Sequence, residues 1–428
     1  MKKLIIPVLM MSMACMPKTN SHEADDTEAK FSLIPITSPA TSNSTVPNLS
    51  LDPDGNVYMS WIEEKDEHAE LRFSHLQGDE WSASQLIASG NNWFINWADF
   101  PALAVNSQQN MLAHFLARSG DETYAYNIHM LQSDNQGSSW KEKFMPHRDG
   151  TKSEHGFVSS LSLADDRFLA TWLDGRNTAI AKAPQNQEAY KDASYGMSLR
   201  AAVIDQDGKL SEEFELDNRV CDCCQTGAAL TAQGPVVVYR NRSDLGEGEE
   251  VRDIGIVRYV DGQWTPPTLV YSDNWEISGC PVNGPVATAL GDQLAVVWYS
   301  APGNIGRVQV AFSFDAGATF AAPIQVDDLN PLGRVDAVFL DPQTVAISWI
   351  ERVDKQAEIR LKTVNINGTL SEAMSLTTTS AKRVSGFPQI TATSNGLYLA
   401  WTSTDSVSMV KTAKVILPGL SSALSQNR

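Results

Sequence analysis

Basic residues are scarce in this sequence of 428 residues, which has 33 lysines and arginines against 51 aspartates and glutamates and a net charge of -18 at pH 7. A surface this acidic repels a phosphate backbone, so we expect no nucleic-acid partner. It also opposes docking of a basic patch on anionic lipid, so we expect contact with a membrane only through a lipid anchor. With 42% hydrophobic residues, the chain can bury a large core as one all-β domain or as two domains.

Long hydrophobic runs are equally scarce. The one clear run, residues 4–13, follows Lys2 and Lys3 and is too short to span a bilayer as a mature helix, so it predicts a secretion signal. Residues 12–15, SMAC, resemble a bacterial lipobox, in which the cysteine is lipidated and becomes the mature N-terminus. We expect a signal peptide at 1–14, a lipid on Cys15 and a polar, flexible tether at 15–29. Ordinary cleavage and an uncleaved anchor are the alternatives.

The residue after the cysteine bears on location. Met16, rather than an aspartate, follows Cys15, and by resemblance to lipoprotein sorting rules this favours the outer membrane. We therefore expect a lipid-anchored protein of the bacterial cell envelope, at the outer membrane and facing the periplasm.

Cysteine is rare, with five in the chain. If Cys15 carries lipid, four remain, and three of them stand within four positions as Cys221, Cys223 and Cys224, with Cys280 further on. Export places these thiols in an oxidising compartment, where cysteines that meet usually pair. Whether they meet depends on the architecture.

The chain also lacks a phosphate-binding loop, a helical metal motif and a convincing Ser-His-Asp order, so three common kinds of catalytic site have no support. What it does contain is a repeat. Short apolar strands end in an aromatic residue about every 50 to 70 residues, the spacing of propeller blades, at Trp61, Phe115, Trp172, Tyr239, Trp298, Trp349 and Trp401.

Each of these strands belongs to a group of four. A strand precedes it across a short Asp-, Asn- and Gly-rich turn typical of hairpins, and two more strands follow. Four antiparallel strands repeated in this way predict a β-propeller over residues 30–417, followed by a tail at 418–428. The fold class we expect is all-β, a seven-bladed propeller whose strand near residues 32–38 completes the seventh blade; a six-bladed propeller is the alternative. We expect a monomer.

Three turns carry a more specific signature. SFDAGATF (313–320) fits the pattern S-x-D-x-G-x-T-F, SDNQGSSW (133–140) fits it with Asn135 in place of Asp, and SHLQGDEW (74–81) keeps part of it. These turns resemble the Asp-box of BNR repeats, so the chain resembles a sialidase-like propeller. The resemblance implies the fold, and it implies an arginine triad if the activity is shared. Thr45, followed by Val46, stands where the first triad arginine would be, so that arginine motif is absent and an exo-sialidase-like activity stays uncertain.

A propeller gathers two sets of loops on one face, which we call the working face: the segments that lead into each innermost strand, and the links between second and third strands. An anionic ligand favours guanidinium groups there, and a glycosidase needs two carboxylates that flank the sugar. The register places the following candidates on this face: for ligand binding Arg118, Arg176, Arg240, Arg242, Arg334 and Asp336, and for catalysis Asp174, Tyr299 and Glu351. Ordinary ion pairing with nearby acids is the alternative for the arginines.

The cysteines fall on the same face. Cys221, Cys223 and Cys224 lead into blade four and Cys280 leads into blade five, so all four should converge near the channel. A bond from Cys280 to one of the other three is the expectation, since the two leading segments adjoin. The alternative is a soft-metal site for zinc or copper in which His155 joins the sulfurs.

Three functions remain open from the sequence. The first is a propeller that binds an anionic small molecule, a glycan or another envelope protein. The second is a sialidase-like glycoside hydrolase. The third is a metal- or redox-linked envelope protein that uses the cysteines.

Overall fold

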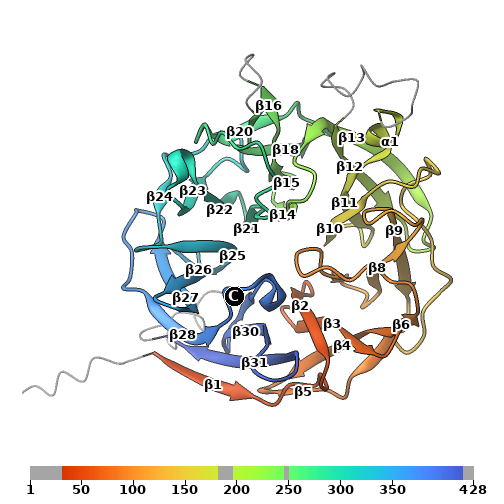
Figure 1. The fold of residues 1–428 in the computed structure, drawn as a ribbon, viewed down its shortest axis with the longest axis horizontal. Helices are drawn as coiled ribbons and strands as arrows, with labels where there is room; N and C mark the ends of the chain where they lie inside the picture. The colour runs from red at the N-terminus through yellow and green to blue at the C-terminus, as the bar shows by residue number, and fades with distance from the viewer. Residues whose placement is uncertain (1–30, 182–195, 245–249, 418–428) are drawn as a thin grey trace, which may run out of the picture.

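The computed structural model describes residues 31–181, 196–244 and 250–417, which form a ring of β-sheets around a central channel (Figure 1). The predicted signal peptide, tether, lipidated Cys15 and C-terminal tail lie outside the described residues. In the part of the chain that the structure describes, no helix has the length and apolar character needed to cross a membrane.

The described strands pair into seven antiparallel sheets, one for each blade, and one short ribbon, so the seven-bladed propeller is confirmed. Blades one to three contain β2 (Ser44–Leu51), β3 (Val57–Lys65), β4 (His68–Gln77), β5 (Glu80–Trp81) and β6 (Gln85–Gly90); β7 (Leu103–Val105), β8 (Met111–Arg118) and β9 (Tyr126–Ser133); and β10 (His155–Ser162), β11 (Phe168–Asp174), β12 (Met197–Ile204) and β13 (Leu210–Val220), with α1 (Arg176–Ala181) after β11.

Blades four to seven complete the ring. They contain β14 (Gly227–Thr231), β15 (Gly234–Arg240), β18 (Ile254–Val260), β19 (Gln263–Trp264) and β20 (Thr268–Tyr271); β21 (Val286–Leu290), β22 (Gln293–Ser300), β23 (Arg307–Ser313) and β24 (Ile324–Gln325); β25 (Pro331–Asp341), β26 (Thr344–Val353), β27 (Gln356–Asn365) and β28 (Met374–Thr379); and β29 (Gln389–Thr393), β30 (Gly396–Ser403), β31 (Met409–Ile416) and β1 (Ser32–Ile36). The ribbon β16 (Ser243–Asp244) and β17 (Glu250–Val251) follows β15, and single 3-10 turns occur at η4 (Pro302–Asn304) and η5 (Arg383–Ser385).

The repeat aromatics lie in the second strands and fill the space between blades. Trp61, Trp172, Trp298 and Trp349 are fully buried. Trp172 of blade three belongs to the same core cluster as Leu112 of blade two. Burying about 200 Å² of a tryptophan at roughly 25 cal/mol per Å² contributes about 5 kcal/mol before entropy costs. The core is therefore a series of layers between neighbouring sheets.

The N-terminal strand closes the ring, as the repeat predicts. β1 pairs antiparallel with β31, from Ser32 opposite Ile416 to Ile36 opposite Thr412. The strand ends at Ile36, a little earlier than expected, and the chain then turns at residues 38–40, where Ser38 Oγ accepts the N–H of Ala40 at 3.3 Å. Closure in this way covers an outer edge that would otherwise be open to another chain (Figure 1).

The Asp-box-like turn between β23 and β24 is held by side chain to backbone hydrogen bonds. Asp315 Oδ1 accepts the N–H of Thr319 at 2.9 Å, and Ser313 Oγ accepts the N–H of Gly317 at 2.8 Å. Gly317 has a φ of 83°, which favours glycine. Asn135 makes the bond equivalent to that of Asp315 in blade two. These contacts are local and stabilise the hairpin.

The segments that lead into the innermost strands bend sharply at the working face. Val46, Phe157, Val282 and Arg334 have φ values of 49°, 55°, 51° and 56°, which are unusual for residues other than glycine. In blades one, three and six a shift in strand register accompanies the bend, and such bulges redirect side chains. The leading segments of successive blades thereby approach one another around the channel.

Candidate functional site

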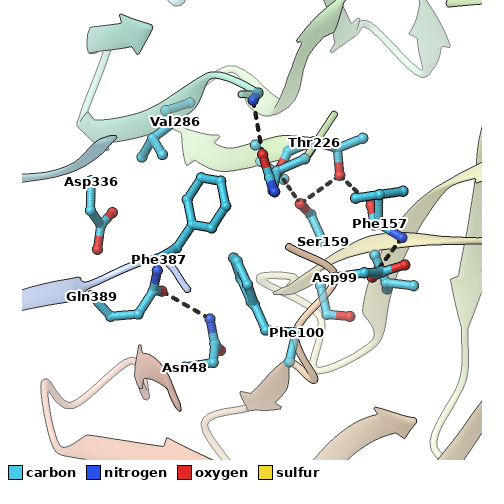
Figure 2. Close-up of a pocket in the computed structure, with 18 of the residues that line it drawn as sticks. Asn48, Asp99, Phe100, Phe157, Ser159, Thr226, Val286, Asp336, Phe387 and Gln389 are labelled. Carbon is cyan, nitrogen blue, oxygen red and sulfur yellow. Dashed lines mark hydrogen bonds between the residues drawn. The ribbon is translucent and has the colours of Figure 1, made fainter. Parts of the chain in front are cut away.

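A cavity of about 200 Å³ lies in the central channel, and the leading segments or innermost strands of all seven blades line it (Figure 2). One lining residue from each blade, in chain order, gives the set Asn48, Asp99, Ser159, Thr226, Val286, Asp336 and Gln389. The cavity is the one place in the described fold where every repeat contributes to a common surface, so it is the first candidate for ligand binding.

Aromatic rings form part of the cavity wall. Phe387 and Phe100 both line it, with their ring centroids 6.0 Å apart (Figure 2). Trp97 stacks on Phe387 from outside the lining, at 5.6 Å between centroids. This packing fixes the Phe387 ring, so one face of the cavity is rigid and apolar.

Amide and hydroxyl groups form the rest of the wall. Asn48 Nδ2 donates to Gln389 Oε1 at 3.1 Å, joining blades one and seven. The hydroxyls of Ser159 and Thr226 lie 2.8 Å apart and join blades three and four. These groups are neutral and can each exchange a hydrogen bond with a bound molecule, so the cavity combines aromatic surface with uncharged donors and acceptors.

Two buried carboxyl groups also line the cavity. Burial raises the pKa of Asp99 to about 8, even though its Oδ1 accepts the N–H of Phe157 at 2.9 Å. Burial likewise raises the pKa of Asp336 to about 7, and its Oδ2 accepts the N–H of Ile390 at 2.6 Å. Each carboxyl therefore ties its blade to the next, and at neutral pH Asp99 is mostly protonated whereas Asp336 is about half ionised.

Two of the candidate arginines hold blades together. Arg240 is buried and donates to the carbonyl oxygens of Asn283, Tyr299 and Arg252. Arg334 donates to Ser385 Oγ at 2.7 Å and to the carbonyl oxygen of neighbouring residues in the segment before blade seven. Both guanidinium groups are used inside the protein by neutral oxygen atoms, so they are neither free forks for an anion nor the ion pairs with acids that were the alternative.

The other arginines have partners of different kinds. Arg176 forms two hydrogen bonds with Asp174, at 2.8 and 2.7 Å, and also contacts Glu213. Arg242 pairs with Asp222 and Glu250 on the working face. Arg118 is exposed, and its guanidinium lies 5.4 Å from the Phe94 ring centroid. The structure thus distributes these side chains over several blades and does not gather them at one point.

The catalytic candidates share a structural partner, the indole of the repeat tryptophan. Trp172 Nε1 donates to Asp174 Oδ2 at 2.9 Å, and Trp349 Nε1 donates to Glu351 Oε2 at 2.7 Å. Glu63 accepts the Trp61 indole N–H in the same way. The pattern Trp-x-acid therefore recurs as part of the repeat and could have been read from the sequence.

Tyr299, the third catalytic candidate, is half-buried beside the segment that leads into blade five. Its ring packs edge-on against Trp275 at 5.7 Å between centroids, and burial raises its pKa. Asp174 and Glu351 come from blades three and six, on β11 and β26, and none of the three catalytic candidates is among the residues that line the cavity.

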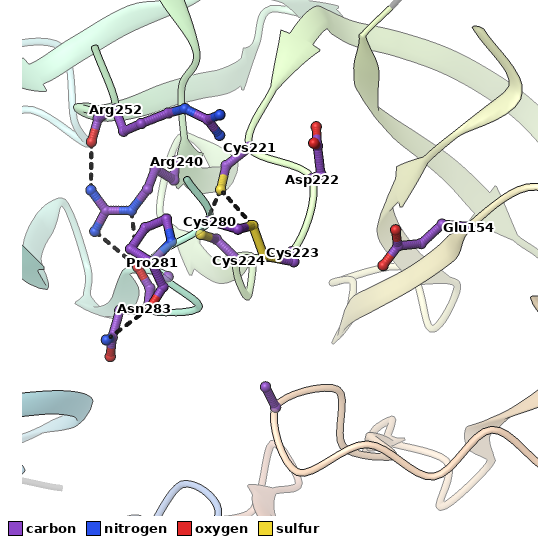
Figure 3. The surroundings of a disulfide bond; sticks show 12 residues. Glu154, Cys221, Asp222, Cys223, Cys224, Arg240, Arg252, Cys280, Pro281 and Asn283 are labelled. Carbon is purple, nitrogen blue, oxygen red and sulfur yellow. Dashed lines mark hydrogen bonds between the residues drawn. A yellow bond between two sulfur atoms is a disulfide. The ribbon is translucent and has the colours of Figure 1, made fainter. Parts of the chain in front are cut away.

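The four cysteines converge at the leading segments of blades four and five (Figure 3). Cys223 and Cys280 form a disulfide with 6.3 Å between their Cα atoms, which confirms the expected bond from Cys280. Cys221 and Cys224 are free and buried, with 2.7 Å between their Sγ atoms. The four sulfur atoms lie within 4.8 Å of one another, so the cluster could hold a metal if the disulfide were reduced.

Close approach of the two leading segments explains this convergence. A Cβ at Gly284 would lie 2.0 Å from the backbone oxygen of Gln225. The N–H of Gly284 donates to Gln225 Oε1 at 2.9 Å. Only glycine permits the contact, and it brings Cys280 within reach of the cysteines that precede Gln225.

His155 does not join the sulfurs, contrary to the metal-site alternative. Its Nδ1 lies 3.2 Å from the carbonyl oxygen of Ser153, and its Nε2 faces Asp149 Oδ2 at 3.2 Å and Asp174 Oδ1 at 3.7 Å. These contacts turn the ring toward blades two and three. With His147, whose ring stacks on it at 3.8 Å, it belongs to a separate buried cluster.

Several residues of these sites were not predicted from the sequence. His147 and Asp149 lie in residues 145–154, which follow the bridge between Met130 and Phe144 in blade two and have no repeat counterpart. Phe387 is hidden in a short apolar segment before blade seven. Asp99 had a positional signal, since it stands in the segment that leads into an innermost strand.

No protein-family model matches the chain, and no curated protein matches it. Among solved structures, the polysaccharide lyase Uly1 has a TM-score of 0.50 at 9% identity and covers 86% of this chain and 89% of its own. The α-L-arabinofuranosidase Arb93A from Fusarium graminearum has a TM-score of 0.49 at 12% identity, covering 90% and 97%.

A sialidase is also similar. The Hadza microbial sialidase Hz136 has a TM-score of 0.44 at 12% identity over 72% of this chain, and the chain spans 63% of the length of that sialidase. At these identities the likeness concerns the fold alone, which is a β-propeller.

Proposed function

We propose that this protein is an exported, lipid-anchored propeller that binds a glycan-like ligand in its central channel. The observation that carries the proposal is the cavity to which all seven blades contribute, with aromatic rings on one side and amides and hydroxyls on the other. Sugar rings present C–H faces and hydroxyl groups, and such a wall complements both.

The charges near the cavity favour an uncharged sugar unit over an anion. Asp99 and Asp336 are the ionisable groups of the lining. Arg240 and Arg334 would attract a carboxylate, but their N–H groups already donate to backbone carbonyls and to a serine hydroxyl. An anionic ligand would therefore find no free guanidinium group in the lining, and the ionised fraction of Asp336 would repel it.

The size of the cavity limits what can enter. At about 200 Å³ it is smaller than the roughly 300–1,000 Å³ typical of sites for drug-sized ligands. We infer that one sugar unit or the end of a chain occupies it. The neighbours in fold are a polysaccharide lyase, an arabinofuranosidase and a sialidase, which agrees with a glycan ligand without specifying one.

Glycan-array binding followed by calorimetry tests this proposal. We expect Phe387→Ala to weaken binding of the best array ligand by at least tenfold, because the ring is a fixed part of the cavity wall. Phe314→Ala is the matched control, since Phe314 is 54% exposed in the turn between β23 and β24 and away from the cavity.

Equal binding by both variants, or no glycan bound at all, would overturn the channel proposal. A screen of fluorogenic glycosides, sialosides included, addresses the hydrolase alternative on the same samples. Turnover that Phe387→Ala abolishes and Phe314→Ala preserves would establish an enzyme at this cavity.

A metal- or redox-linked role is the second candidate, and the four clustered sulfurs favour it. Thiolates suit zinc and monovalent copper, but all four can act as ligands only after the bond between Cys223 and Cys280 is reduced. Elemental analysis of protein purified with and without reductant distinguishes a resident metal from a purely sulfur-based role.

A further inference from the structure

The cysteine cluster contains a disulfide and a dithiol in direct contact. Cys221 Sγ lies 2.7 Å from Cys224 Sγ and 3.8 Å from Cys280 Sγ, which is one end of the disulfide. The glycan proposal uses none of these atoms. A free thiol next to a disulfide sulfur is the arrangement from which thiol–disulfide exchange begins.

Solvent access differs across the cluster. Cys280 is exposed and Cys223 is partly exposed, whereas Cys221 and Cys224 are each only 1% exposed. The disulfide is therefore the part of the cluster that solvent reaches, and the dithiol beside it is buried; Figure 3 shows the four cysteines together. A molecule in solution can reach the outer pair but has no direct path to the inner pair.

The surroundings favour a thiolate on one inner cysteine. Burial opposes ionisation of Cys221, but contact with Cys224, the charge of Arg252, the N–H of Cys223 and the charge of Arg240 together lower its pKa. Burial and the neighbouring Cys221 raise the pKa of Cys224. The position of Cys221 Sγ, 3.8 Å from Cys280 Sγ, makes it the inner thiol that is placed to attack the disulfide.

We propose that the four cysteines form a thiol–disulfide exchange relay that passes an electron pair between the buried Cys221–Cys224 pair and the exposed Cys223–Cys280 pair. In the first step the Cys221 thiolate attacks Cys280 Sγ, the Cys221–Cys280 bond forms, and Cys223 leaves as a thiolate. In the second step Cys224 gives its proton to the Cys223 thiolate and attacks Cys221, the Cys221–Cys224 bond forms, and Cys280 leaves as a thiolate.

The net reaction is balanced. One disulfide, Cys223–Cys280, and one dithiol become the disulfide Cys221–Cys224 and the exposed dithiol, with no external oxidant. The outer dithiol can then reduce the disulfide of a small molecule or a peptide. That disulfide is the oxidant of the relay and accepts the two electrons. Because all four sulfurs lie within 4.8 Å, neither step requires a large movement.

Disulfide mapping tests the relay on the full chain. Protein carrying two thiols is prepared, by partial reduction where required, and equilibrated. The free thiols are then trapped with N-ethylmaleimide in acid. The trapped protein is digested without reductant and analysed by mass spectrometry. We expect wild-type protein to contain both the Cys223–Cys280 and the Cys221–Cys224 isomer. An acid-trapped, urea-unfolded sample is the control for disulfide scrambling.

Two matched serine variants separate the steps. Cys224→Ser allows the first step but blocks the second, so the Cys221–Cys280 isomer should accumulate. Cys221→Ser removes the attacking thiol, so Cys223–Cys280 should be the single isomer. A fixed Cys223–Cys280 bond in both wild type and Cys224→Ser would overturn the relay, and so would four thiolates holding one equivalent of zinc or copper.

Discussion

At the scale of single residues, a polar side chain on the working face is not the same as a polar side chain available to a ligand. The repeat register predicts that Arg240 and Arg334 belong to this face, but their guanidinium groups point to backbone carbonyls of the next blade. The partners of Arg240 come from Asn283 and Tyr299, which are distant in sequence. Such contacts depend on the bends of the leading segments, and nothing in the local sequence encodes them.

Asp99 gives a residue-scale prediction about pH. Its pKa rises from 3.8 to about 8 on folding, chiefly through burial. Between those values the folded protein binds more protons than the unfolded chain, so this group makes the free energy of unfolding fall as pH rises from about 4 to about 8. Asp99→Asn keeps an oxygen that can accept the N–H of Phe157, and we expect it to flatten this decline.

Urea unfolding of wild type and Asp99→Asn at several pH values between 4 and 8 measures the effect. The variant should match wild type near pH 4 and exceed it near pH 8. Asp405→Asn is the control, because Asp405 is exposed with a lowered pKa and is ionised in both states across this range. Parallel curves for wild type and Asp99→Asn would contradict the assignment.

At the scale of strands and blades, the sequence was most informative. Seven aromatics with a common register predict seven second strands, because each must bury its ring against a neighbouring sheet. The disulfide partner Cys280 also followed from this register. Residues 145–154 could not be predicted, because they have no counterpart in the other blades and their position is set by the cluster of His147, Asp149 and His155.

Ring closure gives an element-scale prediction. Removing residues 31–36 leaves β31 with an open edge, since β1 is its outer partner. We expect a chain that begins at Thr37 to unfold at a lower temperature and to self-associate through that edge. A chain that begins at Phe31 keeps the strand and should behave as the longer protein does.

Calorimetry and light scattering compare the two truncations. The pair differs by only six residues, so a difference in melting temperature or particle size reports on β1 itself. Identical melting and scattering would mean that pairing of β1 with β31 contributes little to closure.

At the scale of the whole molecule, the acidic charge and the position of β1 both bear on the proposed lipid anchor. The full chain has a net charge of -18, which gives no electrostatic attraction to anionic lipid, so the proposed membrane attachment depends on the lipid expected at Cys15. β1 begins at Ser32 on the outer rim (Figure 1).

The last prediction concerns that anchor. If Cys15 is lipidated, wild-type protein expressed in a bacterium should incorporate a fatty-acid label and sediment with membranes, and Cys15→Ser should do neither. A single acyl chain binds membranes only weakly, so firm sedimentation would indicate the multiple chains of a lipoprotein. Ser12→Leu is the matched control, because it restores the residue usual in the lipobox and should label at least as well as wild type. Label retained in Cys15→Ser would refute the anchor at Cys15, because the lipid would then be attached at another residue, and a wild type without label would refute lipidation altogether.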